Sequence, residues 1–121
     1  MRYDESEFIQ ALGVVPKDGT EGHGIERVFE CAQGGLRLRV SVFQYDGDVA
    51  VSIYQESGAN AVITRWARRF TQAECVRDPR GDECLQIVYP VCTVPEARPL
   101  RERMRLYVQP QIRMTLEYDS D

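Results

Sequence analysis

Histidine and lysine are almost absent from this sequence of 121 residues: His23 is its one histidine and Lys17 its one lysine. Histidine is the usual general base and metal ligand near neutral pH, so its scarcity excludes most acid–base and metal-dependent chemistry. The sequence also lacks the GxxxxGK(S/T), GxGxxG, GxSxG and HExxH patterns of nucleotide-binding, hydrolase and metalloprotease sites. We therefore expect a protein that is not an enzyme, with no catalytic residue and no cofactor. A second alternative to the function argued below is a small enzyme that uses His23. We favour the interpretation that His23, which lies between two glycines, is a solvated loop residue.

Long apolar runs are absent as well. No stretch approaches the roughly 20 apolar residues that cross a bilayer. The N-terminal sequence MRYDESEFIQ opens with acids, whereas a secretory signal has a basic region followed by an apolar one. These features predict a cytoplasmic protein with no membrane partner, and its length predicts a single domain over residues 1–121.

Paired cysteine motifs are also lacking. The four cysteines include no CxxC pair, so we expect no metal site. In a cytoplasmic protein we interpret the four cysteines as core or near-core thiols. Cys75 and Cys84 flank a predicted hairpin, and the sequence leaves open whether these two residues can pair.

A short helix is predicted at the N-terminus, over residues 4–13. Asp4 or Ser6 caps its start, the acidic side chains of its first turn suit the positive end of the helix dipole, and Gly13 ends it. The glycine-rich residues 16–24 predict a flexible loop.

Alternation of apolar and polar residues dominates the rest of the chain. Residues 25–118 read as about seven strands joined by turn signals, which predicts antiparallel pairing. We expect a mainly β fold, an antiparallel β-sandwich or half-open barrel with meander-like hairpins, closed at one end by the helix.

The stretch 36–55 predicts a hairpin about Asp46-Gly47, which is the strongest short-range hairpin signal. A two-residue turn there pairs Arg39 with Tyr54, Arg37 with Glu56, and Phe43 with Ala50. Phe43 is then left on the outer face without an obvious cover. A second turn at residues 58–59 sets Trp66 opposite Val51, which predicts that the single tryptophan lies in the core.

Arginine and aromatic residues recur on the outward side of these strands, and both are enriched at protein interfaces. We therefore expect a protein-interaction module, such as an inhibitor, immunity or accessory protein of a bacterial system, that binds a protein partner or a second copy of itself. The predicted binding residues are Arg39, Phe43, Tyr54 and Arg65, all on one side of neighbouring strands. A β-platform for single-stranded nucleic acid is the alternative, which the net charge of −4 disfavours.

Overall fold

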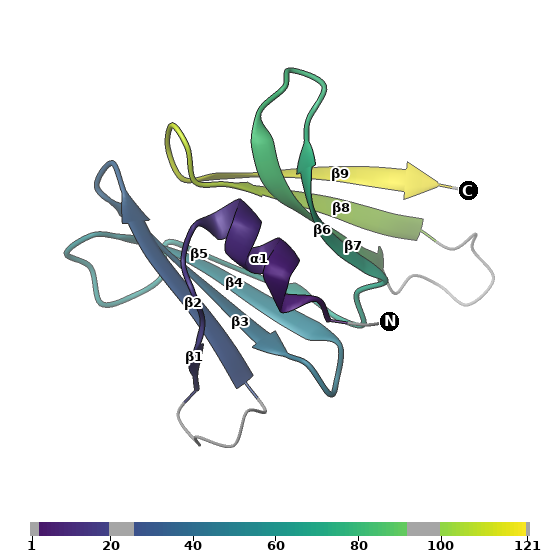
Figure 1. Ribbon diagram of the computed structural model, residues 1–121, viewed down its shortest axis with the longest axis horizontal. Helices are drawn as coiled ribbons and strands as arrows, with labels where there is room; N and C mark the ends of the chain where they lie inside the picture. Colours follow the sequence, from purple (N-terminus) through teal and green to yellow (C-terminus); the bar gives the residue numbers. More distant parts are fainter. Residues whose placement is uncertain (1–2, 20–25, 92–99, 121) are drawn as a thin grey trace.

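The computed structural model describes residues 3–19, 26–91 and 100–120, and these form one helix and nine strands (Figure 1). The elements are α1 (Glu5–Leu12), β1 (Lys17–Asp18), β2 (Glu26–Gln33), β3 (Leu36–Phe43), β4 (Asp48–Gln55), β5 (Ile63–Ala67), β6 (Gln72–Arg77), β7 (Glu83–Val91), β8 (Leu100–Tyr107) and β9 (Arg113–Ser120). Sheet A has the order β1-β2-β3-β4-β5 and sheet B the order β6-β7-β8-β9. All neighbouring strands are antiparallel. The predicted mainly β, antiparallel fold with one short helix is confirmed, and the strands form two sheets and not a closed barrel.

The helix forms where the sequence predicts it. Asp4 is the N-cap, and its carboxylate accepts a hydrogen bond from the Ser6 N–H at 3.1 Å. Gly13 ends the helix with φ 74°, a conformation that favours glycine. Phe8 and Leu12 lie on the buried side of the helix.

Two strands were not predicted. Lys17 and Asp18, inside the segment expected to be a flexible loop, form β1 and pair with β2, so that expectation is wrong at these residues. The second is β6, whose polar residues weaken the apolar alternation. It pairs with β7, the next strand along the chain, and a distant residue also holds it, because the Cys75 N–H donates to the Glu7 carboxylate of α1 at 3.1 Å.

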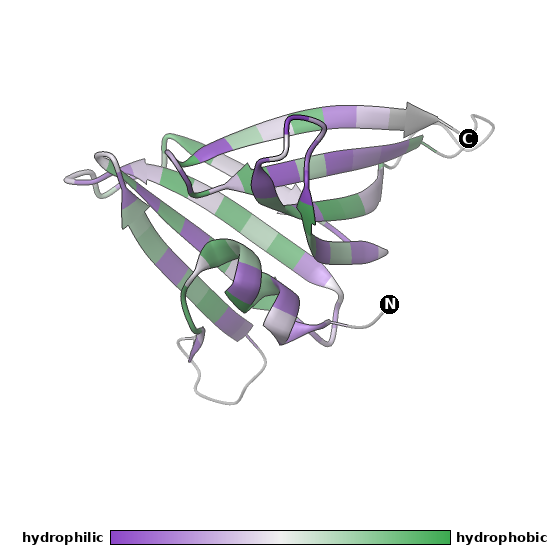
Figure 2. Cartoon of the chain, turned by 45° about the horizontal axis from the view of Figure 1, so that its top comes forward, coloured by the Kyte–Doolittle hydropathy of each residue, from purple (hydrophilic) through white to green (hydrophobic). Residues whose placement is uncertain are grey.

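The hairpin formed by β3 and β4 is present, but its register differs from the predicted one. Phe43 lies opposite Asp48, so the loop has four residues, 44–47, where a two-residue turn was expected. The slip amounts to two positions, and side chains alternate with period two along a strand. Every side chain therefore keeps its predicted face and only its cross-strand neighbour changes. Figure 2 shows this alternation of hydrophilic and hydrophobic residues along the strands.

The register between β4 and β5 differs from the predicted register by one position, and this difference does change the face on which each side chain lies. Trp66 lies opposite Ala50, where Val51 was expected. A one-residue slip moves each side chain to the other face of the sheet. The prediction that Trp66 lies in the core is therefore wrong, and Arg65 takes the inward-facing position beside Val51.

One hydrophobic core joins the two sheets and the helix. The Phe8 ring stacks on Phe29 of β2 with 5.4 Å between centroids, and α1 also packs against β6 and β7. Figure 1 shows α1 lying where the two inclined sheets diverge. The core residues of sheet B include Leu85, Ile87 and Tyr89, which point inward as predicted. Among the described residues, no helix has the length and apolar character needed to traverse a membrane.

Candidate functional site

An aromatic stack covers Phe43 on the outer face of sheet A. The rings of Phe43 and Trp66 lie 5.7 Å apart, centroid to centroid, at an angle of 20°. The Arg68 guanidinium lies over the Trp66 ring at 4.4 Å. Trp66 remains 41% exposed. We call these three side chains the Phe43–Trp66–Arg68 stack. Their contacts with one another hold their planar groups in place at the surface.

The turn that precedes β4 holds the end of β5 in position. The Asp48 carboxylate accepts a hydrogen bond from the Arg69 N–H at 2.9 Å and pairs with Arg68 at 3.4 Å. The Phe70 N–H donates to the Gly47 carbonyl oxygen at 2.8 Å. Arg69 has φ 53°, a left-handed conformation that is uncommon for a residue with a side chain. The chain therefore turns sharply directly after the stack, and Asp48 stabilises that turn.

Arg39 and Tyr54 lie on the same outer face as Phe43, as predicted, but their neighbours differ. The shifted register pairs Tyr54 with Arg37, whose guanidinium lies 4.6 Å from the ring centroid and donates to the Gly58 carbonyl oxygen at 2.7 Å. Arg39 lies between Ser52 on β4 and Glu30 on β2. The pKa of Glu30 is lowered, mainly by its hydrogen bond to Lys17 and also by the nearby positive charge of Arg39.

Arg65 lies on the opposite face of sheet A from the other predicted binding residues, so the expectation of a shared face is wrong. Its Nη2 donates to both carboxylate oxygens of Glu102 on β8, at 2.7 and 2.9 Å. The Tyr89 hydroxyl of β7 donates to the same carboxylate. Glu102 is 1% exposed. The hydrogen bond to Glu102 raises the pKa of Arg65. This network joins sheet A to sheet B through charge-assisted hydrogen bonds.

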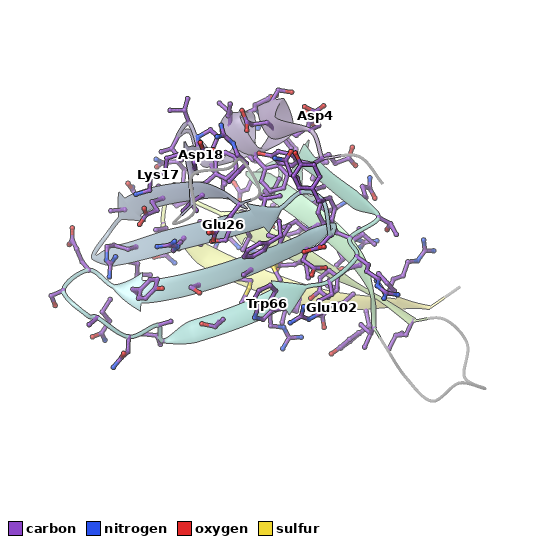
Figure 3. The ribbon with its side chains drawn as sticks, turned by 90° about the horizontal axis from the view of Figure 1, so that it is seen from below. Asp4, Lys17, Asp18, Glu26, Trp66 and Glu102 are labelled. Atoms are coloured by element: carbon purple, nitrogen blue, oxygen red, sulfur yellow. The ribbon has the colours of Figure 1, made fainter. Side chains whose placement is uncertain are left out.

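A cleft opens beside this network, between β5 and the ends of β7, β8 and β9. It encloses about 390 Å³ and is lined by Thr64, Arg65, Trp66, Arg68, Tyr89, Pro90, Val91, Glu102 and Tyr118. Figure 3 shows Trp66 and Glu102 at the same end of β5. We call this hollow the inter-sheet cleft. Arg65 and Trp66 are consecutive residues, so β5 presents one to the outer face and the other to the core side.

Sequence reasoning missed Glu102, Arg68 and Tyr118 at this site. One signal was available for Glu102, because it falls in the same alternation as the core residues Met104 and Leu106. An acidic residue in a core position requires a charged or hydrogen-bonding partner. The partner itself, Arg65, lies 37 residues away in the sequence and on the other sheet, so only the tertiary structure identifies it.

No cluster of three or more histidine, cysteine, aspartate or glutamate residues that could hold a metal ion occurs in the described parts of the chain. His23 lies outside the described residues, and the enzyme hypothesis that depends on it stays a hypothesis. Cys75 lies opposite Leu85, whereas Cys84 lies opposite Val76, so the two thiols point to different sides of sheet B. Both are free. The hairpin geometry therefore does not bring them together as a disulfide.

We expect Cys75 to be a poor nucleophile in the folded protein. Burial, together with the nearby negative charges of Glu83 and Glu7, raises the pKa of its thiol to about 11. Since the thiolate is the reactive form, alkylation of native Cys75 by iodoacetamide at pH 8 should be about 100-fold slower than alkylation of an ordinary cysteine, and its rate should rise until the pH reaches about 11. Peptide mapping by mass spectrometry measures this rate, and the urea-unfolded protein is the control. Rapid labelling of native Cys75 at pH 8 would contradict the prediction.

Comparison with known proteins finds one similar structure. No family model matches the sequence, and no curated protein matches it. The chain is similar to a chain in a solved structure described as a contact-dependent growth inhibition toxin–immunity protein complex from Klebsiella pneumoniae 342. The alignment covers 98% of this chain and 96% of that chain, with a TM-score of 0.72 and 13% sequence identity. At this identity the likeness establishes a shared fold over nearly the full length of both chains.

Proposed function

We propose that this protein is a non-enzymatic protein-interaction module of the inhibitor or immunity type, which binds a protein partner through the arginine- and aromatic-rich outer face of sheet A. The observation that carries the proposal is the shared fold, over 98% of the chain, with a component of a toxin–immunity protein complex. Fold alone does not determine function, so the proposal also requires a surface suited to a protein partner.

The outer face of sheet A meets this requirement. Arginine, tryptophan and tyrosine dominate the residues that contribute most to interface affinity. Here Trp66 lies between the Phe43 ring and the Arg68 guanidinium, and Tyr54 is stacked under Arg37. Because these contacts already restrict the side chains of this surface, those side chains lose less conformational entropy on binding than the side chains of a mobile surface would. The predicted residues Arg39, Phe43 and Tyr54 extend this surface across β3 and β4.

Single-stranded nucleic acid remains the second candidate occupant of this face. Stacked aromatic side chains and arginines favour it. Against it stand the net charge of −4 and the pairing of arginines on this face with protein groups, as between Arg37 and the Gly58 carbonyl oxygen and between Arg68 and Asp48. Nucleic-acid binding is expected to weaken steeply as the salt concentration rises. A fluorescence-anisotropy titration with a labelled oligonucleotide at two salt concentrations distinguishes the candidates.

Growth rescue tests the proposed function directly. If a toxin domain is encoded beside the gene for this chain, it is expressed from an inducible promoter, with and without this protein in the same cells. We expect this protein to restore growth and to bind the purified toxin domain in isothermal titration calorimetry. If it neither restores growth nor binds, the immunity proposal is wrong. Sedimentation of the protein alone tests the remaining alternative, in which the partner is a second copy of the chain.

Replacing Phe43 tests the proposed surface. Phe43→Ala removes the support under Trp66 and is expected to weaken binding of the toxin domain by about 30-fold, the effect of a typical interface hot spot. Tyr45→Ala is the matched control, because Tyr45 is an exposed aromatic residue in the neighbouring turn, outside the stack. If the two variants bind the toxin domain with equal affinity, the interface does not lie on this face.

A further inference from the structure

Seven large hydrophobic side chains are exposed among the described residues, and two of these, Val15 and Tyr45, lie in loops. The other five are Val62, Ile63, Trp66, Leu116 and Tyr118. The first three lie on or directly before β5, and the other two lie on β9. Each of these strands is the last strand of its sheet. Edge strands with exposed apolar side chains are rarely left uncovered, because their free backbone groups can pair with another chain.

The two exposed apolar residues of β9 lie on the core side of sheet B. Leu116 pairs with Met104, and Tyr118 pairs with Glu102, and both of those partners are buried. Tyr118 nevertheless is 61% exposed and lines the inter-sheet cleft with Trp66 and Arg65. Within the described residues, the core side of sheet B therefore extends beyond the part that sheet A and α1 cover, and the cleft lies at this part.

The charged side chains that the cleft exposes to solvent are the arginines Arg65 and Arg68. Glu102 is buried beneath Arg65 and accepts hydrogen bonds from Arg65 and Tyr89, so its negative charge is already compensated. The Arg65 side chain binds Glu102 through Nη2 and is still 39% exposed. The Arg68 side chain is 64% exposed and contacts Asp48 at 3.4 Å. Planar guanidinium groups with unused N–H donors bind carboxylates in a bidentate manner.

We propose that the inter-sheet cleft receives an extended segment of the protein partner, and that an acidic side chain of this segment binds Arg68 and the exposed edge of Arg65. The apolar side chains of the same segment contact Trp66 and Tyr118 on the two walls. This inference rests on the proposed function, since it takes the partner to be a protein, and it adds the chemistry of the segment that the partner inserts. Such a segment would also cover the exposed aromatic side chains of Trp66 and Tyr118.

Charge reversal at Arg68 is the first arm of the test. Arg68→Glu is expected to weaken binding of the toxin domain by about 30-fold, because the variant places a carboxylate against the acidic side chain of the partner. Arg80→Glu is the matched control. It makes the same change in net charge at an exposed position in the turn between β6 and β7, so it should change the affinity less than threefold, through long-range electrostatics alone. Tyr118→Ala is expected to weaken binding about tenfold without any change in charge.

The single tryptophan provides the second arm. Protein labelled with 5-fluorotryptophan has one ¹⁹F resonance, from residue 66 in the cleft wall. Addition of the unlabelled toxin domain should shift this resonance, and the shift should be reduced in Tyr118→Ala at equal toxin concentration. A single-stranded oligonucleotide of twelve thymidines serves as the competing occupant and should leave the resonance unchanged.

The outcomes separate the two proposals. If the wild-type protein does not bind the toxin domain, the proposed function fails and the cleft assignment fails with it. If the wild type binds and Arg68→Glu binds as tightly as Arg80→Glu, the proposed function stands and the cleft assignment alone is wrong. If the oligonucleotide shifts the resonance at low salt, the occupant of the cleft is nucleic acid and not an acidic segment of a protein.

Discussion

Arg65→Ala is expected to lower the free energy of unfolding by about 3 kcal/mol, although the Arg65 side chain lies at the surface of the cleft. The reason is its partner. Glu102 is 1% exposed, and without Arg65 its carboxylate would remain buried with the Tyr89 hydroxyl as its hydrogen-bond donor. An uncompensated buried charge costs more than the ion pair contributes. Urea denaturation followed by circular dichroism measures the change.

Two further variants show whether burial of the charge is the cause. Arg68→Ala removes a neighbouring arginine whose ion pair with Asp48 is exposed, and should cost less than about 1 kcal/mol. In the double variant Arg65→Met/Glu102→Leu both charges are absent, so its stability should return close to that of the wild type. If Arg65→Ala is no less stable than Arg68→Ala, the network between the sheets contributes nothing to stability.

Phe8→Ala is expected to lower the free energy of unfolding by about 3–5 kcal/mol. The Phe8 side chain is fully buried, and its ring contacts Phe29 at 5.4 Å and Tyr3 at 5.2 Å, measured between centroids. It lies on the helix that packs against both sheets, so its loss leaves a cavity at the point where the sheets diverge. Urea denaturation measures this variant as well.

The matched control is another phenylalanine. Phe43→Ala removes the same number of atoms from a partly exposed site on the outer face, and should cost about 1–2 kcal/mol. Hydrogen exchange adds a local measurement, because Phe8→Ala should reduce the protection of amides in β6 and β7 more than in β3 and β4. Equal destabilisation by the two substitutions would contradict the central position assigned to Phe8.

The two residues replaced in these destabilised variants, Phe8 and Arg65, lie on opposite sides of the space between the two sheets. Phe8 on α1 fills the space between the sheets on one side, and the Arg65–Glu102 pair joins them at the cleft. The cleft is therefore built on a polar network that also stabilises the fold. For this reason Arg68, Phe43 and Tyr118 test partner binding, whereas a variant of Arg65 would confound binding with stability.

Much of the architecture follows from local sequence. The capped helix, the hairpin around Asp46-Gly47 and the faces of β3 and β4 all depend on residues within a few positions of one another. Alternation with period two assigns each residue to a face whether the hairpin loop has two residues or four, so the error in that register changed neighbours and not faces. This is why Arg39, Phe43 and Tyr54 lie on the same face of sheet A, as the sequence predicted.

The tertiary structure alone decided where β5 presents its side chains. The turn before β5 contains no residue pair that determines the loop length, and a difference of one position exchanges Trp66 with Arg65 between the outer face and the core side. The pairing of Glu102 with Arg65 and the opening of the cleft depend on how two separate sheets incline toward each other, which no local pattern encodes. The sequence by itself therefore determined a mainly β domain with an arginine- and aromatic-rich outer face. The packing of one sheet against the other determined the cleft, because only that packing brings residues of β5, β8 and β9 together.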